Sequence, residues 1–333
     1  MTDETASALV MDNFQKSSKN MFVAQGLDRA HNRRKDPDWI ARGMRDPGSF
    51  FVAVWQSKVL VAECEVPGPV LLEWKQLEGH AEGDSTFFLG EKHGHSYFAV
   101  DLDQEAPGAF GHVGRFRDLR AVAPLLSRDD GALLAYAKTL AYWNERNHFC
   151  GACGGRNEIR EGGHCRACVN PQCGIVHFPR TDPAVIVLIK SGEKCLLGRQ
   201  TIWPERMYSV LAGFVEPGES AEGAVAREVF EEVGLLVKNI RYHSSQPWPF
   251  PCSLMLGFTA EAQDQRIRLG DEELEDARWF GRRELREAVE NGVVKLPTPV
   301  SISYRLIEDW FDAESPLCLR DFAGQGFAIR KEQ

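Results

Sequence analysis

The chain has 333 residues and a formal net charge of −9, with 43% hydrophobic and 26% charged residues. These fractions are ordinary for a globular protein, and the length allows two domains and a small insert. The apolar runs are too short to span a bilayer, and the polar N-terminus does not resemble a signal peptide, so we expect a cytoplasmic protein with no membrane partner. The acidic balance argues against a surface built to attract polyanions.

Residues 1–147 predict an N-terminal α/β domain. Stretches rich in β-branched and aromatic residues, separated by Gly, Pro and Asp, predict strands at residues 49–55, 58–63, 70–72, 86–89 and 96–101. Residues 132–146 have the apolar spacing of a helix. His80, His93 and His95 are scattered, which favours surface histidines over a metal site. We expect this domain to serve as a scaffold or as part of a dimer interface.

Residues 148–180 contain five of the nine cysteines, and this clustering favours a metal site over disulfides. Cys150 and Cys153 form a C-x-x-C knuckle, and a closed tetrahedral zinc site needs two further thiolates. Cys165, Cys168 and Cys173 compete for these two places, and spacing alone favours Cys165 with Cys168. A closed site has no open coordination position, so we favour a structural zinc over a nucleic-acid-binding role.

Residues 181–333 predict a second α/β domain. Residues 184–189 and 194–199 have the pattern of paired strands, and residues 209–215 lead into a helix. The later elements are expected as strands at 237–243, 254–262 and 274–280 and a helix at 282–291.

The stretch from 213 to 237 contains an amphipathic helix with one acidic stripe. Glu228, Glu231 and Glu232 fall on one face, and the neighbouring apolar stripe of Val225, Val229 and Val233 would dock the helix on a core. Carboxylates this close repel one another, and a hard divalent cation such as Mg²⁺ would relieve the repulsion. The alternative is a solvated acidic face.

The surrounding residues favour the metal. The order of Gly213, Glu219, Arg227, the three glutamates and Gly234 resembles the complete signature of the Nudix hydrolases. Gly218 would allow the turn before the helix, and Ser220 would cap the helix. The resemblance implies a C-terminal Nudix α/β/α sandwich with a mixed sheet, preceded by a four-cysteine zinc ribbon and the N-terminal α/β domain. It also implies catalysis with Mg²⁺ or Mn²⁺.

Residues 245–253 read SQPWPFPCS, and three prolines stiffen this segment. Trp248 and Phe250 would therefore be fixed to stack on a flat ring or to line its pocket, unless they fold into the core. The segment resembles the SQPWPFPxS motif of the NADH pyrophosphatase family, and residues 148–180 and 297–310 resemble the same family. The resemblance implies hydrolysis of the diphosphate of NAD(H) to nicotinamide mononucleotide and AMP. Some family members also remove NAD caps from RNA.

The resemblance also implies the residues of the site. The expected catalytic set is Glu219, Arg227, Glu228, Glu231 and Glu232, and Glu273 joins Glu228, Glu231 and Glu232 as a Mg²⁺ or Mn²⁺ ligand. The general base is left open between Glu231 and Glu273. The expected zinc ligands are Cys150, Cys153, Cys168 and Cys173, with Cys165 as the alternative to Cys168. The expected substrate contacts are Phe178, Phe214, Gln246, Pro247, Trp248, Pro249, Phe250, Pro251, Cys252, Ser253 and Ser303.

Two rival functions remain. One is an enzyme of different preference, acting on NAD-capped RNA, ADP-ribose or other dinucleotides. The other is a non-catalytic sensor of NAD metabolites, which the complete set of signature glutamates disfavours. A homodimer is expected from the resemblance alone.

Overall fold

The computed structural model describes residues 12–81, 83–103, 108–270 and 273–323. The chain divides into two compact units. The N-terminal unit contains residues 22–181 and 248–252, and the C-terminal unit contains residues 12–21, 182–247 and 253–323. Residues 12–21 thus group with the C-terminal unit, and residues 248–252 group with the N-terminal unit. The boundaries of the expected domains 1–147, 148–180 and 181–333 stay a prediction. No helix in the described ranges has the length and hydrophobicity needed to cross a membrane.

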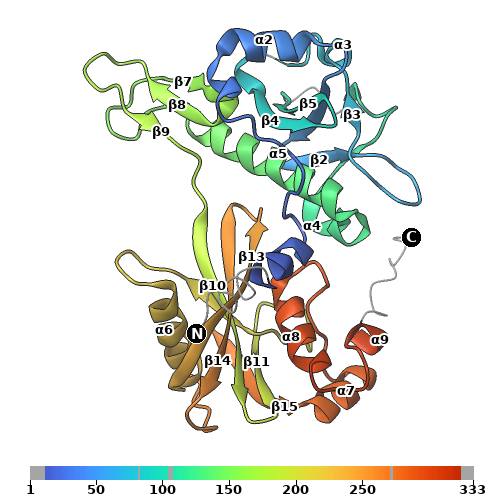
Figure 1. The fold of residues 1–333 in the computed structure, drawn as a ribbon, viewed down its shortest axis with the longest axis vertical. Coiled ribbons are helices and arrows are strands. Elements are labelled where there is room, and N and C mark those ends of the chain that lie inside the picture. Colours follow the sequence, from blue (N-terminus) through green and yellow to red (C-terminus); the bar gives the residue numbers. More distant parts are fainter. Residues whose placement is uncertain (1–11, 82, 104–107, 271–272, 324–333) are drawn as a thin grey trace, which may run out of the picture. The chain divides into compact units, whose positions relative to one another are not determined.

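The C-terminal unit is built on a six-stranded mixed sheet (Figure 1). The strands have the order β13-β14-β10-β11-β15, and β12 also pairs with β10. β10 runs parallel to β14 and antiparallel to β11 and β12. Their bounds are β10 Asp182–Ser191, β11 Lys194–Gln200, β12 Leu211–Phe214, β13 Val237–Trp248, β14 Ser253–Ala262 and β15 Leu274–Gly281. β13 thus runs five residues beyond its predicted end at 243.

Alternation along β10 creates a core on each face of this sheet. Val185 and Val187 pack with Val225, Val229 and Val233 of helix α6, which spans Ala221–Val233. Ile186 and Leu188 face the opposite core, which is covered by α7 (Arg282–Glu290) and α8 (Ile302–Asp312). The short α9 (Arg320–Ala323) follows. Helices on both faces of a mixed sheet confirm the predicted α/β/α sandwich.

The N-terminal unit contains a second six-stranded sheet of order β4-β5-β1-β2-β6, with β3 paired to β1. The strand bounds are β1 Phe50–Trp55, β2 Lys58–Val61, β3 Leu71–Leu72, β4 Thr86–Lys92, β5 His95–Asp101 and β6 Arg115–Arg117. The helices are α2 Pro37–Arg45, α3 Trp74–Leu77, α4 Leu119–Val122 and α5 Arg128–Arg146, with 3₁₀ turns at Arg33–Lys35, Gly83–Ser85 and Ala123–Leu125. α5 packs against β1, β4 and β5.

The two sheets share one connectivity. In each, the first strand pairs antiparallel with the second and third and parallel with the fifth, and the second pairs antiparallel with the sixth. Strands β1–β6 therefore correspond in order to β10–β15. The main difference lies between the third and fourth strands, where α6 has 13 residues and α3 has four. A helix of four residues is too short to carry a stripe of three carboxylates.

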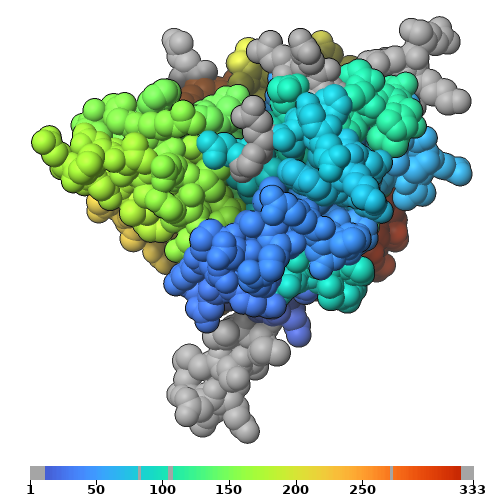
Figure 2. All heavy atoms as spheres, turned by 90° about the horizontal axis from the view of Figure 1, so that it is seen from above, coloured from blue at the N-terminus to red at the C-terminus, as the bar shows by residue number. Residues whose placement is uncertain are grey.

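Residues 148–180, the predicted zinc ribbon, belong to the N-terminal unit. The three-stranded sheet of the ribbon has the order β7-β8-β9, with bounds Asn157–Arg160, Cys165–Cys168 and Val176–His177. The 3₁₀ turn Glu161–Gly163 seats the ribbon on the larger sheet, because a β-carbon at Gly162 would meet Ile40 of α2 and Phe88 of β4. In the space-filling view, the yellow-green ribbon forms one corner of this unit beside the blue segment (Figure 2).

Candidate active site

Helix α6 begins and ends as its sequence predicts. The Ser220 hydroxyl accepts a 3.0 Å hydrogen bond from the Gly223 N–H, which satisfies a free donor at the helix start. Gly234 terminates the helix in the left-handed conformation, with φ of 67°. The valine stripe is fully buried, so the helix is held against the sheet in one orientation. Its acidic stripe therefore has a fixed position.

Arg227 organises this acidic stripe. Its Nη2 and Nε atoms donate to the two carboxylate oxygens of Glu219, at 2.7 and 3.2 Å. Its Nη1 donates to Glu228 Oε1 and to Glu231 Oε2, both at 2.9 Å. Nη2 also donates to the carbonyl of Phe214 at the end of β12. One guanidinium thus ties three carboxylates to the loop before the helix, and charge-assisted bonds of this kind are the strong ones.

Glu228 lies directly against the backbone of Gly213. A β-carbon at Gly213 would overlap the Glu228 carboxylate, so only glycine leaves room for that side chain. Burial raises the pKa of Glu228, and the neighbouring charges of Glu231 and Glu273 add to this effect although Arg227 opposes it. Hydrogen bonds from Arg227 lower the pKa of Glu219. Glu228 is thus a carboxylate whose charge is disfavoured mainly by burial, and a divalent cation beside it would favour the charged form.

The loop before β15 brings Glu273 toward this group. The Arg268 N–H donates to the Val233 carbonyl at 2.9 Å, and the Gly270 N–H donates to the Glu232 carbonyl at 3.2 Å. A β-carbon at Gly270 would overlap the Glu231 carbonyl. The loop therefore lies tightly across the C-terminal end of α6. Glu232 itself is buried, while Glu273 is exposed.

The four expected zinc ligands come together in the ribbon. Cys150, Cys153, Cys168 and Cys173 have sulfur atoms within 4.8 Å of one another, and in the described part of the chain this is the only group of three or more His, Cys, Asp or Glu so close. The Cys150–Cys173 and Cys153–Cys168 sulfur pairs are 3.8 and 3.5 Å apart. Tetrahedral zinc with bonds of about 2.3 Å separates its sulfurs by about 3.8 Å, so these residues fit a zinc ion.

The surroundings of the sulfurs also suit a metal. The Gly155 N–H donates to Cys153 Sγ at 3.4 Å, and the His177 ring lies 3.3 Å from Cys150 Sγ. Such contacts orient ligands and stabilise thiolates. Cys165 is buried at the other end of β8, outside the group, and burial raises the pKa of its thiol. The structure therefore brings together the set with Cys168 and leaves out the alternative Cys165.

The chain matches three family models in the order of its segments. They are the NADH pyrophosphatase-like rudimentary NUDIX domain at residues 48–143, the NADH pyrophosphatase zinc ribbon domain at 145–178 and the NUDIX domain at 180–296. It is also 37% identical over 313 residues to the NAD-capped RNA hydrolase NudC of Mycobacterium bovis, which covers 90% of this chain and 97% of that protein. The chain belongs to the NADH pyrophosphatase family of Nudix hydrolases.

Other members of the family are similar over most of the chain. The NAD-capped RNA hydrolase NudC of Stutzerimonas stutzeri is 38% identical over 263 residues, covering 79% of this chain and 83% of that one. The NAD-capped RNA hydrolase NUDT12 of Macaca fascicularis is 31% identical over 348 residues, covering 90% and 75%. The family assignment confirms the Nudix signature at α6 and the zinc ribbon.

The SQPWPFPCS segment of this family member is divided between the two units. Gln246 lies in the C-terminal unit and is buried, with its amide donating to the carbonyls of Met21 and Val300 and accepting from the Ile302 N–H. Pro247 is exposed and Ser253 is buried in the same unit. The Gln246 side chain is thus fully occupied in tying β13 to the start of α8.

Residues 248–252 belong instead to the N-terminal unit. The half-buried rings of Trp248 and Phe250 pack edge to face at 5.1 Å, and Phe22 contacts both. Arg120 lies 4.6 Å from the centre of the Phe250 ring, and Lys138 donates a 2.7 Å hydrogen bond to the Pro249 carbonyl. Pro251 is exposed and Cys252 half-buried. The aromatic rings of the segment thus form a cluster within this unit.

The remaining expected substrate contacts differ in exposure. Phe214 and Phe178 are exposed, at 60% and 63%, in the C-terminal and N-terminal units respectively. Ser303 is buried, and its hydroxyl pairs with the Ser209 hydroxyl at 2.7 Å. Its side chain therefore links the start of α8 to the segment that leads into β12.

Two positions that are important for this geometry are not among the residues predicted from the sequence. Gly270 resembles any loop glycine, and only the fold reveals its contact with α6. Lys138 does have a signal, because it interrupts the apolar pattern of α5, and burial lowers the pKa of its amine. A lysine among buried apolar residues usually has a specific acceptor, here the Pro249 carbonyl.

Proposed function

We propose that the protein hydrolyses the diphosphate of NAD(H), giving AMP and nicotinamide mononucleotide, the latter reduced when NADH is the substrate. The observation that carries this proposal is the arrangement of Glu219, Glu228 and Glu231 around Arg227, with Glu228 seated against Gly213. An acidic group fixed this firmly on a rigid helix is pre-organised for metal-assisted attack on a phosphate.

Each residue has a distinct role in this scheme. Glu228, Glu231, Glu232 and Glu273 would hold Mg²⁺ or Mn²⁺, and the ion would neutralise charge at the diphosphate and favour ionisation of the attacking water. Arg227 sets the positions of the carboxylates, and Glu219 in turn holds Arg227 with two hydrogen bonds. Glu231, which is half exposed, or Glu273 accepts the proton of the attacking water.

Recognition of the dinucleotide uses residues outside the helix. The exposed rings of Phe214 and Phe178 are suited to stacking on flat bases. The segment from Gln246 to Ser253 and Ser303 are proposed as further substrate contacts, as the resemblance to the family implies. The names of the relatives support NAD as the recognised group, since they are hydrolases of NAD-capped RNA. NAD-capped RNA is therefore the second candidate substrate, and we propose a homodimer as the active assembly.

Product analysis tests the proposal. The zinc-loaded protein is incubated with Mg²⁺ and NADH, ADP-ribose or NAD-capped RNA at matched concentrations. Faster release of AMP and reduced nicotinamide mononucleotide from NADH supports the free dinucleotide. Faster cleavage of the capped RNA makes the RNA the preferred substrate, and no cleavage of any of the three refutes an enzyme. Repeating the assay with Mn²⁺ shows which ion is used, and light scattering gives the assembly state.

A matched pair of variants ties the activity to the acidic stripe. Glu228→Gln keeps the size of the side chain but removes the charge next to Gly213, so kcat should fall by about 10²-fold or more. Glu222→Gln makes the same change on the exposed first turn of α6 and should leave kcat unchanged. Equal effects of the two changes would place the chemistry elsewhere.

A further inference from the structure

The N-terminal unit contains a cavity of about 280 Å³ at one end of its sheet. It is bounded by the start of β3, the turn between β4 and β5, the first turns of α5, and residues 24–27. Because the two sheets share one connectivity, the elements that correspond to these in the other sheet are the start of β12, the turn between β13 and β14, and the first turns of α8. These are the elements that contain or adjoin the SQPWPFPCS segment and Ser303. Residues 249–252 of the β13–β14 turn group with the N-terminal unit.

The helix starts correspond in detail. α5 and α8 are each capped by a serine, Ser127 and Ser301, whose hydroxyl accepts a backbone N–H of the first turn. Asp129 follows its capping serine by two residues, as Ser303 follows Ser301. Asp129 thus occupies the position of a residue that we expect to contact substrate. This one step of the inference rests on the proposed function, whereas the cavity and its lining do not.

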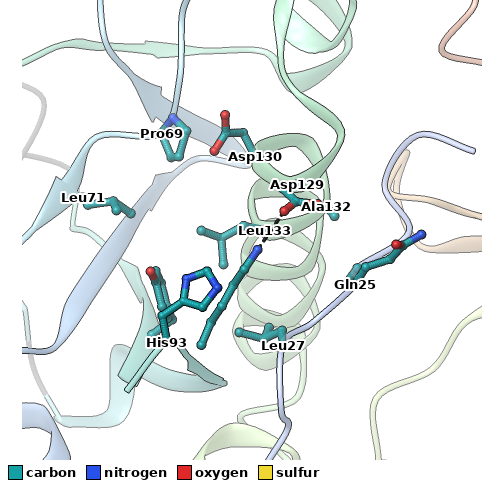
Figure 3. A pocket seen from close by; sticks show the side chains of 12 residues that line it. Gln25, Leu27, Pro69, Leu71, His93, Asp129, Asp130, Ala132 and Leu133 are labelled. Atoms are coloured by element: carbon teal, nitrogen blue, oxygen red, sulfur yellow. Dashed lines mark hydrogen bonds and ion pairs between the residues drawn. The ribbon is translucent and has the colours of Figure 1, made fainter. Parts of the chain in front are cut away.

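The lining of the cavity combines apolar walls with acidic groups. Figure 3 shows Leu27, Leu71 and Leu133 around the space, with Asp129 and Asp130 on the α5 side and His93 opposite. A flat ring would fit between such leucines, since the volume is near the lower end of the range for small-molecule sites. The cavity therefore suits a single small ring system.

The charged side chains that line the cavity indicate the charge of the ring that would bind there. Lys92 donates a 2.7 Å hydrogen bond to Asp129, which neutralises both groups. Asp130 accepts a hydrogen bond from the neutral Ser127 hydroxyl, so its negative charge is not cancelled. The charged side chains of the lining, Lys92, Asp129 and Asp130, therefore sum to about −1. This charge and the Tyr97 ring that also lines the cavity favour a cationic ring and disfavour a phosphate.

We propose that this cavity is a second, non-catalytic binding site for a nucleoside with a positively charged planar ring, represented by oxidised nicotinamide riboside. The ring lies between the leucines, and the Asp130 carboxylate accepts hydrogen bonds from the ribose hydroxyls. The ligand is bound but not cleaved, because α3 takes the place of the Nudix helix and has four residues. The unit thus keeps a ligand-binding end without the catalytic helix.

Binding is measured on the full-length, zinc-loaded protein by calorimetry with three probes. Oxidised nicotinamide riboside should bind at the cavity, and its uncharged reduced form and adenosine should bind there at least tenfold more weakly. Leu133→Trp fills the cavity, and Asp130→Asn removes its charge, so either change should weaken the oxidised probe at least tenfold. The matched controls Leu125→Trp and Asp38→Asn, both at exposed positions of the same unit, should leave the affinity unchanged.

The variants separate this site from the Nudix site. If the Leu133→Trp variant binds the oxidised probe as tightly as the parent, the probe binds at another site and the proposal is refuted. Equal affinity for the oxidised and reduced probes also refutes it. NADH hydrolysis is measured on the same samples. If the parent protein hydrolyses NADH and the Leu133→Trp change does not weaken binding of the probe, only the second site is refuted. A protein that binds the probe at the cavity but cleaves no dinucleotide refutes only the proposed function.

Discussion

Replacing Gly213 with alanine should disable the enzyme without unfolding it. A β-carbon at this position would lie 1.9 Å from the Glu228 carboxyl carbon, whereas real contacts do not approach within 3.0 Å. The carboxylate must therefore move by about 1 Å, which breaks its 2.9 Å hydrogen bond with Arg227. A misplacement of this size in a catalytic group costs about 10²-fold in rate. The backbone of Gly213 has no positive φ, so alanine adds no strain there.

The assay is steady-state hydrolysis of NADH at saturating Mg²⁺, with the melting temperature measured in parallel. We expect kcat to fall about 10²-fold and the melting temperature to change little, because the clash is with a side chain that can turn away. Gly281→Ala is the matched control, since a β-carbon at Gly281 meets no atom within 4 Å. It should retain the parental kcat.

A double variant shows that the clash itself is responsible. Glu228→Asp shortens the side chain by one methylene and leaves room beside an alanine at 213. Gly213→Ala should therefore lower kcat much less in the Glu228→Asp variant than in the parent protein. Such a difference is the coupling expected between two residues in contact. A Gly213→Ala protein with unchanged kcat would refute the inferred contact, and additive effects in the double variant would refute its role.

Three further outcomes are expected. Gly270→Ala should push the loop away from α6 and displace Glu273, so the Mg²⁺ concentration for half-maximal rate should rise about tenfold, and an unchanged metal dependence would contradict this. Cys168→Ser should lose the zinc in a metal analysis while Cys165→Ser retains it, and the reverse would favour the other ligand set. Burial raises the pKa of Asp101 to about 6, so the folded state binds its proton more tightly and the resulting stability is lost as pH rises through about 6. Asp101→Asn should therefore be about 1–3 kcal/mol more stable at pH 8 and no more stable below pH 4 in urea titrations, whereas an equal gain at both pH values would exclude ionisation as the cause.

The position and the buried face of α6, the helix with the signature glutamates, can be predicted from local sequence patterns. The spacing of Val225, Val229 and Val233 fixes which face of α6 is buried, and this places the glutamates on the other side. The capping serine and the terminal glycine fix its ends. These features depend on residues close together in the sequence, which is why they can be inferred without the fold. The same holds for most strands of both sheets, whose ends shift by only a few residues, but the three-residue β6 (Arg115–Arg117) is not predicted.

Contacts between distant residues cannot be inferred in this way. Spacing alone favours Cys165 over Cys173 as a ligand, because the path of β8 that turns Cys165 away from the other sulfurs is a property of the folded ribbon. Gln246 likewise belongs to a motif expected to shape the pocket, yet its amide bonds to Met21 and Val300, which lie 225 and 54 residues away in the sequence. Tertiary pairing decides such cases.

The repeated sheet shows how the N-terminal unit can have the same strand arrangement without a catalytic motif. Both units use the first strand to organise the sheet, so the core does not depend on the segment between the third and fourth strands. In the C-terminal unit that segment is α6 with its glutamates, and in the N-terminal unit it is the four-residue α3. The core does not require the long helix, but the chemistry does. The N-terminal unit therefore has the shared sheet and the cavity at the β4–β5 turn but no helix long enough for an acidic stripe, which is why we propose binding without hydrolysis there.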